Sequence, residues 1–579
     1  MIKRKKSLPY PGKTRGFSKC EQAVNGRLER LKNGYSWCTI SRLRLTLLHL
    51  IPIYQGGDAV EERQNNATKT ISVVMLITLV GKILGLYRDR LLAVHYSTQM
   101  EANAFFTASR IPRVFFDAVF ASAIAACFIP VFSEYLEKKG KKEAFRFAGS
   151  FITIMAVLTA SLTLLGMLFP QPLVTLFADY EDPQTTALAI SLTRVMFPTF
   201  FFSGVAFSLV GVLQAQDHFT APALMSTLSN LVIIAYFFFF NQSMGIYGLA
   251  GAYLVGWLIQ GLIQIPPLRR LGYRYRPSWD FRSEGMKKVF VLMAPVMVST
   301  WVQPINLVIN SRFGSRLYDG AGVSAMEYSN NLYLVIAGTF ILSITNVIFP
   351  RLSRLTAGGQ QGEFRDTLRQ TVRSSLFFVL PMTAGLMVVA RPLISFIYGG
   401  GAFDEFSLQI TSTALVWLSL GMVGYALQNI LSRAYFARQD GRTPLVAGAV
   451  SIGVNLVLCM VLVQRLEVAG LAISSAVSST VYALLLLLPL QHRGEAILDG
   501  AMGRDVLKMV LATLVMGLAT AAMLSGLTTV LPTGKLGELV SLGVCVVFGL
   551  LVYFFLTLGL RLSEAKLILS VLKHLRKRG

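Results

Sequence analysis

Long apolar stretches, separated by short polar connections or by proline and glycine, follow one another from about residue 71 to residue 560. Most are close to 20 residues long, the length at which an apolar helix crosses the hydrocarbon core of a bilayer. We predict about 14 transmembrane helices, which makes the fold class an all-α polytopic membrane protein. The predicted spans are 71–94, 104–131, 147–169, 187–213, 222–240, 246–268, 289–309, 323–348, 374–389, 408–431, 445–463, 469–490, 506–527 and 540–560.

The composition narrows the functional class. Of the 579 residues, 54% are hydrophobic and only 15% are charged, which excludes an ordinary soluble enzyme or a disordered chain. The five cysteines and five histidines are scattered without metal-binding spacing, and the chain has no GxxxxGK[ST] loop. We therefore expect no metal, no cofactor and no ATPase activity in this chain.

The net charge of +24 reflects membrane topology rather than nucleic-acid binding. Connections after even-numbered helices hold roughly 23 Lys and Arg residues against 5 in the opposite connections, and the positive-inside rule places the first group in the cytoplasm. An even number of spans then puts both termini in the cytoplasm. We expect residues 1–66 to be a disordered basic arm and residues 561–579 to be a basic tail at the inner membrane surface.

The chain contains an internal repeat. Pro130-Val-Phe-Ser133 recurs as Pro350-Arg-Leu-Ser353, and Asn230-Leu-Val232 recurs as Asn455-Leu-Val457. The matches keep their order and a nearly constant spacing, so helices one to six and seven to twelve are two copies of one unit. Paired six-helix units of the same orientation are typical of transporters that hold their substrate between the halves. A duplication retained only for packing is the alternative.

This duplication predicts the domain organisation. The two copies form lobes, and the last two helices stand outside the repeat. The expected divisions are residues 67–268 for the first repeat (N-lobe), 269–492 for the second repeat (C-lobe) and 493–560 for helices thirteen and fourteen.

The first predicted helix carries charges that need an explanation. A charge in the hydrocarbon costs roughly 2.5–3.5 kcal/mol on insertion scales, so it needs a partner, a water-filled cavity or a function. Arg88 and Asp89 lie near the outer end, where Arg88 has the alternative of extending to the interface. Lys82 lies some 11 residues, roughly 16 Å, inside the span, where such an extension explains it less well.

The second predicted helix places Arg110, Arg113 and Asp117 on one face, at positions i, i+3 and i+7. An internal Arg113–Asp117 ion pair is the alternative interpretation, and it leaves Arg110 without a partner. Together the first two helices bring four bases against two acids. A positive, water-accessible pocket of this kind suits an anionic substrate, most naturally a phosphate or a pyrophosphate.

The second repeat is polar but less charged. Asn306 and Asn310 share a face of helix seven, and Asn331 lies on helix eight beside Glu327 and Asn330. Amides in transmembrane helices more often bond to a neighbouring helix than to a ligand. Substrate contact is the second interpretation, and we retain these three residues as candidate binding residues on that basis.

Several segments resemble the MurJ (MviN) family of lipid II flippases, which belongs to the superfamily of multidrug and polysaccharide-lipid exporters. They are Gly81-Lys-Ile-Leu-Gly-Leu-Tyr-Arg-Asp89, Asn103-Ala-Phe-Phe106, Ile111-Pro112, Phe128-Ile-Pro130 and Gln439-Asp-Gly-Arg-Thr-Pro444. The resemblance covers about residues 70–560. It implies a fourteen-helix, two-lobed transporter of the bacterial plasma membrane that serves peptidoglycan synthesis.

The resemblance also implies a central cationic cavity for a pyrophosphate-sugar head and a groove for the polyprenyl tail in the last two helices. The cavity arginines of helix one fall on Lys82 and Arg88, with Asp89 as the neighbouring acid. The arginine pair of helix two falls on Phe116-Asp117, and the Asp-Arg pair of helix eight falls on Asn330-Asn331. The chain therefore departs from the family at three cationic positions.

We expect a flippase that moves a polyprenyl-pyrophosphate-linked glycan, lipid II, from the inner to the outer leaflet by alternating access. Its partners are this glycolipid, membrane lipids and a candidate coupling ion, without nucleic acid. A flippase for another lipid-linked polysaccharide precursor and a multidrug antiporter of the same superfamily are the alternatives. An enzyme is not expected, because the spans offer no paired carboxylates or metal cluster at a membrane face.

Overall fold

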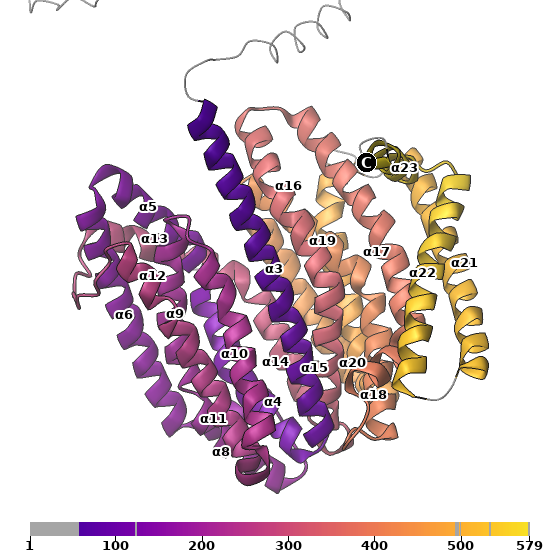
Figure 1. Cartoon of the computed structure of the whole chain (residues 1–579), viewed down its shortest axis with the longest axis horizontal. Coiled ribbons are helices and arrows are strands. Elements are labelled where there is room, and N and C mark those ends of the chain that lie inside the picture. The colour runs from indigo at the N-terminus through magenta and orange to yellow at the C-terminus, as the bar shows by residue number, and fades with distance from the viewer. Residues whose placement is uncertain (1–56, 122–123, 493–496, 498, 532–533, 577–579) are drawn as a thin grey trace, which may run out of the picture. The chain divides into compact units, whose positions relative to one another are not determined.

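The computed structural model describes residues 57–121, 124–492, 497, 499–531 and 534–576. Apart from one isolated bridge between Gly400 and Phe403, the regular elements of these residues are helices (Figure 1). The chain divides into two units, residues 1–72 and 73–579, and the packing reported below lies within the second. Most of the predicted arm, residues 1–56, lies outside the described residues, and residues 57–66 belong to the first helix.

The helices follow the predicted apolar segments. Those of the first repeat are α3 (Gly57–Tyr96), α4 (Met100–Phe116), η1 (Asp117–Ala121), η2 (Ile124–Phe128), α5 (Ile129–Lys138), α6 (Lys141–Leu168), α7 (Pro170–Phe177), α8 (Pro183–Met196), α9 (Thr199–Gln214), α10 (Thr220–Phe239), α11 (Asn241–Leu262) and α12 (Ile265–Arg270).

The helices of the second repeat and the C-terminal segment continue the series. They are α13 (Glu284–Thr300), α14 (Val302–Gly314), η3 (Tyr318–Gly320), α15 (Ala321–Tyr333), η4 (Leu334–Gly338), α16 (Thr339–Ala357), α17 (Gln361–Tyr398), α18 (Glu405–Leu420), α19 (Met422–Ala437), α20 (Arg442–His492), α21 (Gly500–Val530), α22 (Lys535–Gly559) and α23 (Ser563–Arg576).

Within the described residues, nine helices are long and apolar enough to cross a membrane, and α18 with α19 makes a tenth if that bent pair is one span. The count takes α20 as a single helix. Its 51 residues measure about 75 Å at 1.5 Å per residue, far more than the hydrocarbon thickness of about 30 Å. Non-helical backbone at Glu467 divides it. The all-α membrane class is confirmed, whereas the number fourteen stays a prediction.

The backbone repeats unusual conformations at matching places in the two copies. Gly245 of the first copy and Glu467 of the second both have φ of +52°. Asp217 and Gln439, which are separated along the chain by the same interval, have φ of +61° and +60°. A left-handed backbone is costly for residues other than glycine, so its recurrence at the repeat spacing supports a duplicated fold rather than a chance likeness of sequence.

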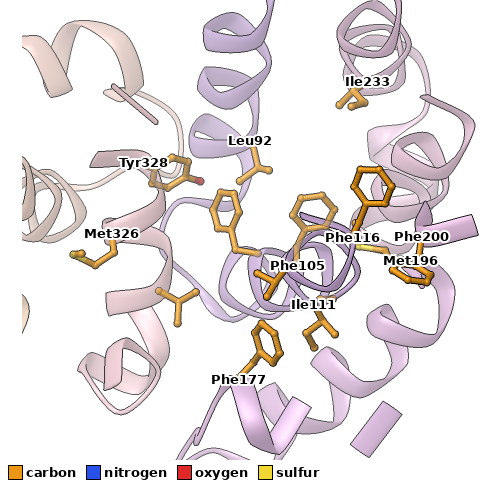
Figure 2. Packing of buried hydrophobic residues seen from close by; sticks show 14 of the residues in the cluster. Leu92, Phe105, Ile111, Phe116, Phe177, Met196, Phe200, Ile233, Met326 and Tyr328 are labelled. Atoms are coloured by element: carbon orange, nitrogen blue, oxygen red, sulfur yellow. The ribbon is translucent and has the colours of Figure 1, made fainter. Parts of the chain in front are cut away.

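An aromatic core around α4 holds the first two helices in place. Figure 2 shows Phe105 and Phe116 of α4 packed toward Phe200 on one side, with Tyr328 of α15 on the other. The Phe116 ring lies 5.0 Å from that of Phe207, centroid to centroid, and Phe116 is only 3% exposed. Helix α4 therefore packs between α8 and α9 of its own repeat and α15 of the second repeat.

The two helices outside the repeat attach to α17. Helices α21 and α22 pack on each other and on α17, and the Tyr553 hydroxyl donates to the Phe377 carbonyl at 2.8 Å. Arg373 of α17 then pairs with Asp505 of α21 and Glu564 of α23, each at 2.8 Å. The outward faces of α21 and α22 remain apolar, as Leu518 at 73% and Leu550 at 62% exposure illustrate.

A close approach of α19 and α20 gives the first prediction. A Cβ added at Gly424 would lie 2.7 Å from the Thr480 backbone nitrogen, so Gly424→Ala forces two backbones apart. We expect a loss of about 1–3 kcal/mol of stability, seen as a lower melting temperature of the purified protein. Gly543→Ala on α22, where a Cβ meets open space, is the matched control and should not lower it. Equal melting temperatures for both variants would contradict this packing.

Candidate functional site

Arg88 of α3 is held by three polar contacts. Its Nε and Nη2 donate to Asp89 Oδ1 at 2.9 and 2.6 Å, and its Nη1 donates to Asn230 Oδ1 of α10 at 3.0 Å. The guanidinium carbon also lies 5.6 Å from the centre of the Tyr253 ring. Arg88 therefore points into the protein rather than to the interface, and the alternative of an outward extension is not what the structure shows.

Asp89 links this charged corner to the second repeat. It is 5% exposed, and the Asn331 amide of α15 donates to its second oxygen at 3.2 Å. Asn331 thus lies beside the Arg88–Asp89 pair. It contributes an amide where the family carries a cation.

Arg110 of α4 has a partner that the sequence analysis did not assign. Its Nη2 bonds to Glu327 Oε2 of α15, and the two side chains are 9% and 15% exposed. Glu327 was visible in the sequence as an acid inside a predicted span, but spacing alone could not show which base it meets. The contact forms because α15 packs against α4, across the two repeats.

Arg113 and Asp117 form a looser pair. Arg113 Nε and Asp117 Oδ2 are 3.7 Å apart, and the side chains are 68% and 48% exposed. Arg113 also acts electrostatically on Glu327 and Tyr253, so it belongs to the same charged region as Arg110 and Arg88. The three residues predicted to share a face of the second helix differ strongly in burial, with Arg110 enclosed and Arg113 accessible.

Lys82 has a hydroxyl rather than a carboxylate as its partner. Its Nζ donates to Thr339 Oγ1 of α16 at 2.6 Å, and none of the ion pairs found among the described residues includes it. Three of the four bases thus pair with three acids (Asp89, Asp117 and Glu327), where the sequence analysis counted two acids on the first two helices. The expected excess of positive charge is corrected downward, because Glu327 arrives from the second repeat.

Asn306 and Asn310 lie elsewhere, on the wall of a cavity of about 320 Å³ in the second repeat. Asn455 Nδ2 of α20 donates to the side-chain oxygens of both at 3.1 Å, and Asn310 donates to Ser475 Oγ at 2.9 Å. The cavity wall also includes Arg110 and Glu327. The structure therefore connects this neutral amide cluster to the charged region through one ion pair.

Phe116 explains one departure from the family pattern. Its ring is enclosed between α4 and α9, so an arginine there would meet apolar side chains in this arrangement. No group of three or more His, Cys, Asp or Glu side chains in the described part of the chain is arranged to hold a metal ion.

Ion pairs also join the two repeats away from this central region. Asp179, between α7 and α8, accepts from Arg316 Nε at 3.0 Å and pairs with Arg312 at 3.4 Å, and Arg316 holds the pKa of Asp179 below its usual value. On α5, Glu134 pairs with Lys288 of α13 and with Lys138, which lower its pKa to about 2.

Comparison with known proteins places this arrangement in a family. The family model described as "Lipid II flippase MurJ" matches residues 94–542. A probable lipid II flippase MurJ of Buchnera aphidicola is 29% identical over 459 residues, which are 78% of this chain and 89% of that protein.

Solved structures share the fold. A structure titled "Lipid II flippase MurJ, inward closed conformation" aligns with a TM-score of 0.69 at 24% identity, over 84% of this chain and 97% of the other. An inward-facing multidrug resistance transporter of the MATE family aligns with a TM-score of 0.61 at 15% identity, over 73% and 98%. The family match over residues 94–542 decides between these two neighbours: this chain belongs to the MurJ family of lipid II flippases.

Proposed function

We propose that this chain moves lipid II from the inner to the outer leaflet of the bacterial plasma membrane by alternating access, with the pyrophosphate held at the charged region between α3, α4 and α15. Membership of the MurJ family supports lipid II as the substrate. The binding site rests on four cations of the two helices that face the second repeat, Lys82, Arg88, Arg110 and Arg113.

The four cations differ in how available they are to an anion. Among the residues that the structure describes, Lys82 has a hydroxyl and no carboxylate as its partner, and Arg113 is 68% exposed and loosely paired. Arg88 and Arg110 are already held by Asp89 and Glu327. We infer that Lys82 and Arg113 contact the pyrophosphate first, because charge-assisted bonds to phosphate need donors that are free to turn toward it.

Competition between Glu327 and the substrate phosphate for Arg110 links substrate binding to movement of the two repeats. The Arg110–Glu327 bond joins α4 to α15, so a phosphate that takes the guanidinium from Glu327 also loosens the contact between the repeats. A substrate shifts a conformational equilibrium only by binding one state more tightly than the other. We infer that the state with Arg110 released is the one that binds the pyrophosphate more tightly.

The ion pairs of Glu134 and Asp179 are candidates for the two ends of the pathway. The basic connections that the positive-inside rule assigns to the cytoplasm include those of Glu134, with Lys138 and Lys288. We place both termini and this cluster on the cytoplasmic side, and Asp179 with Arg312 and Arg316 outside. Alternating access then requires the two clusters to open in turn.

Two further parts of the proposal concern the lipid and the chemistry. The exposed apolar faces of α21 and α22 are suited to the polyprenyl tail, and the surrounding membrane lipids cover the rest. The step breaks and forms no covalent bond, so the chain acts as a transporter and not as an enzyme. A multidrug antiporter is disfavoured, because such a protein needs acids that face a cationic drug. In this chain Asp117 and Glu327 are paired with arginines.

Removing the two cations of α3 tests the site. Lys82→Ala and Arg88→Ala should each reduce the rescue of a bacterium depleted of its own MurJ by tenfold or more in plating efficiency, because the pyrophosphate loses a charge-assisted bond worth about 1.5–3 kcal/mol. The wild-type chain must rescue the strain in the same experiment.

Two variants control for folding. Lys142→Ala removes a cation from an exposed site at the start of α6 and should leave rescue unchanged. Arg88→Ala with Asp89→Asn removes the acid that the single variant leaves buried, and should still fail while reaching the membrane in wild-type amounts. Full rescue by the Lys82 and Arg88 variants would contradict the proposed site, and a wild-type chain that never rescues would contradict lipid II as substrate.

The competition for Arg110 gives a separate prediction. Glu327→Gln removes the competing charge, so purified protein should bind lipid II about three- to tenfold more tightly, whereas Arg110→Gln should bind it more weakly. Quantitative binding to detergent-solubilised protein measures both effects. Unchanged or weaker binding by the Glu327 variant, at an unchanged melting temperature, would show that Glu327 does not compete with the substrate.

A further inference from the structure

The charged corner of the first repeat is built from three helices. Arg88 of α3 donates to Asn230 of α10, and its guanidinium faces the ring of Tyr253 on α11. Asn230 is buried, at 4% exposure, and Arg88 and Tyr253 are partly buried. The helices hold a cation at the point where they meet.

The same corner exists in the second repeat with different side chains. Asn455 matches Asn230 in the sequence repeat, and Asn310 and Ser475 take up the contacts that Arg88 and Tyr253 make in the first repeat. Asn455 donates to Asn310, and Asn310 donates to Ser475, so the contacts between the three helical segments recur. The second repeat thus keeps the contacts between the three helical segments, but it has amides and a hydroxyl where the first repeat has the charged Arg88.

This second corner opens on the cavity of about 320 Å³, a size at the lower end of the range for small-molecule sites, about 300–1,000 Å³. Apart from the Arg110–Glu327 pair, whose charges balance, the polar wall residues that the structure describes are uncharged. The polar lining comprises Gln303, Asn306, Asn310, Asn330, Gln428, Asn455, Ser451, Ser475, Ser478, Ser479 and the tyrosines Tyr333, Tyr425 and Tyr482.

Such a wall matches a particular class of ligand. Amides and hydroxyls both donate and accept hydrogen bonds, as the hydroxyl and acetamido groups of a sugar require, and tyrosine rings present a flat apolar face with a polar edge. A phosphate is a poorer fit, because Arg110, the cation found among the described wall residues, is already bound to Glu327. The cavity size suits one sugar residue rather than an extended chain.

We propose that the cavity of the second repeat binds an uncharged N-acetylated sugar of the lipid-linked substrate while the charged corner of the first repeat binds its pyrophosphate. This inference rests on the proposed function. Arg110 and Glu327 lie in the cavity wall, and Glu327 is also in electrostatic range of Arg88, so a head group that spans the two places would touch the ion pair joining α4 to α15. The substrate would then be recognised by two chemically distinct halves of one duplicated corner.

The test compares two probes, lipid II and undecaprenyl pyrophosphate, which carries the phosphates without the glycan. Ser479→Trp fills the cavity and Asn306→Leu removes part of its amide wall. Both variants should bind lipid II about tenfold more weakly and undecaprenyl pyrophosphate as wild type does. Val477→Trp adds the same bulk two residues away, at an exposed position outside the cavity wall, and should change neither affinity.

The outcomes separate this inference from the proposed function. Loss of lipid II binding alone supports the sugar site, provided that the variants keep the wild-type melting temperature. Unchanged lipid II binding in both cavity variants overturns the sugar site and leaves the flippase proposal intact. A wild-type protein that binds neither probe overturns the proposed function, and a wild-type protein that binds both equally tightly overturns the sugar site alone.

Discussion

The Arg110–Glu327 ion pair is the interaction on which the central region depends. Two charges enclosed within a membrane protein are costly unless they meet, and their meeting requires α4 of one repeat to lie against α15 of the other. The same bond lies in the wall of the polar cavity and in electrostatic range of Arg88 and Arg113. The ion pair can therefore form only when the two repeats lie in this relative position. A ligand that breaks the pair also acts on that position.

The ion pairs also lower the net positive charge that the sequence predicted for the substrate site. Arg88 and Arg110 are held by acids, while Lys82 and Arg113 keep more freedom. A charged region whose cations are partly paired with acids costs less to hold inside the membrane than one with four unpaired charges. It retains donors for an anion, because each guanidinium carries five N–H groups and only some are engaged.

The internal duplication explains how one fold offers two kinds of recognition. Repeated backbone features, such as the positive φ angles at Gly245 and Glu467, preserve the same helical framework in both halves. Side chains at equivalent points have diverged, with Arg88 beside Asn230 in one half and Asn310 beside Asn455 in the other. The backbone sets the meeting point of the helices, and the side chains decide which chemical group suits it.

The sequence by itself determined the class of fold, the positions of the helices, the repeat and the charged residues of α3 and α4. Hydrophobic length and charge are local properties, since a helix in lipid satisfies its own backbone and must hide or pair each charge. Lys82 and Arg88 were identifiable in this way. Only the tertiary structure decided the partners: Glu327 for Arg110, Asn230 for Arg88 and Asn455 for Asn310. Those contacts join residues that lie far apart along the chain, and their geometry depends on how the helices pack, which no local pattern specifies.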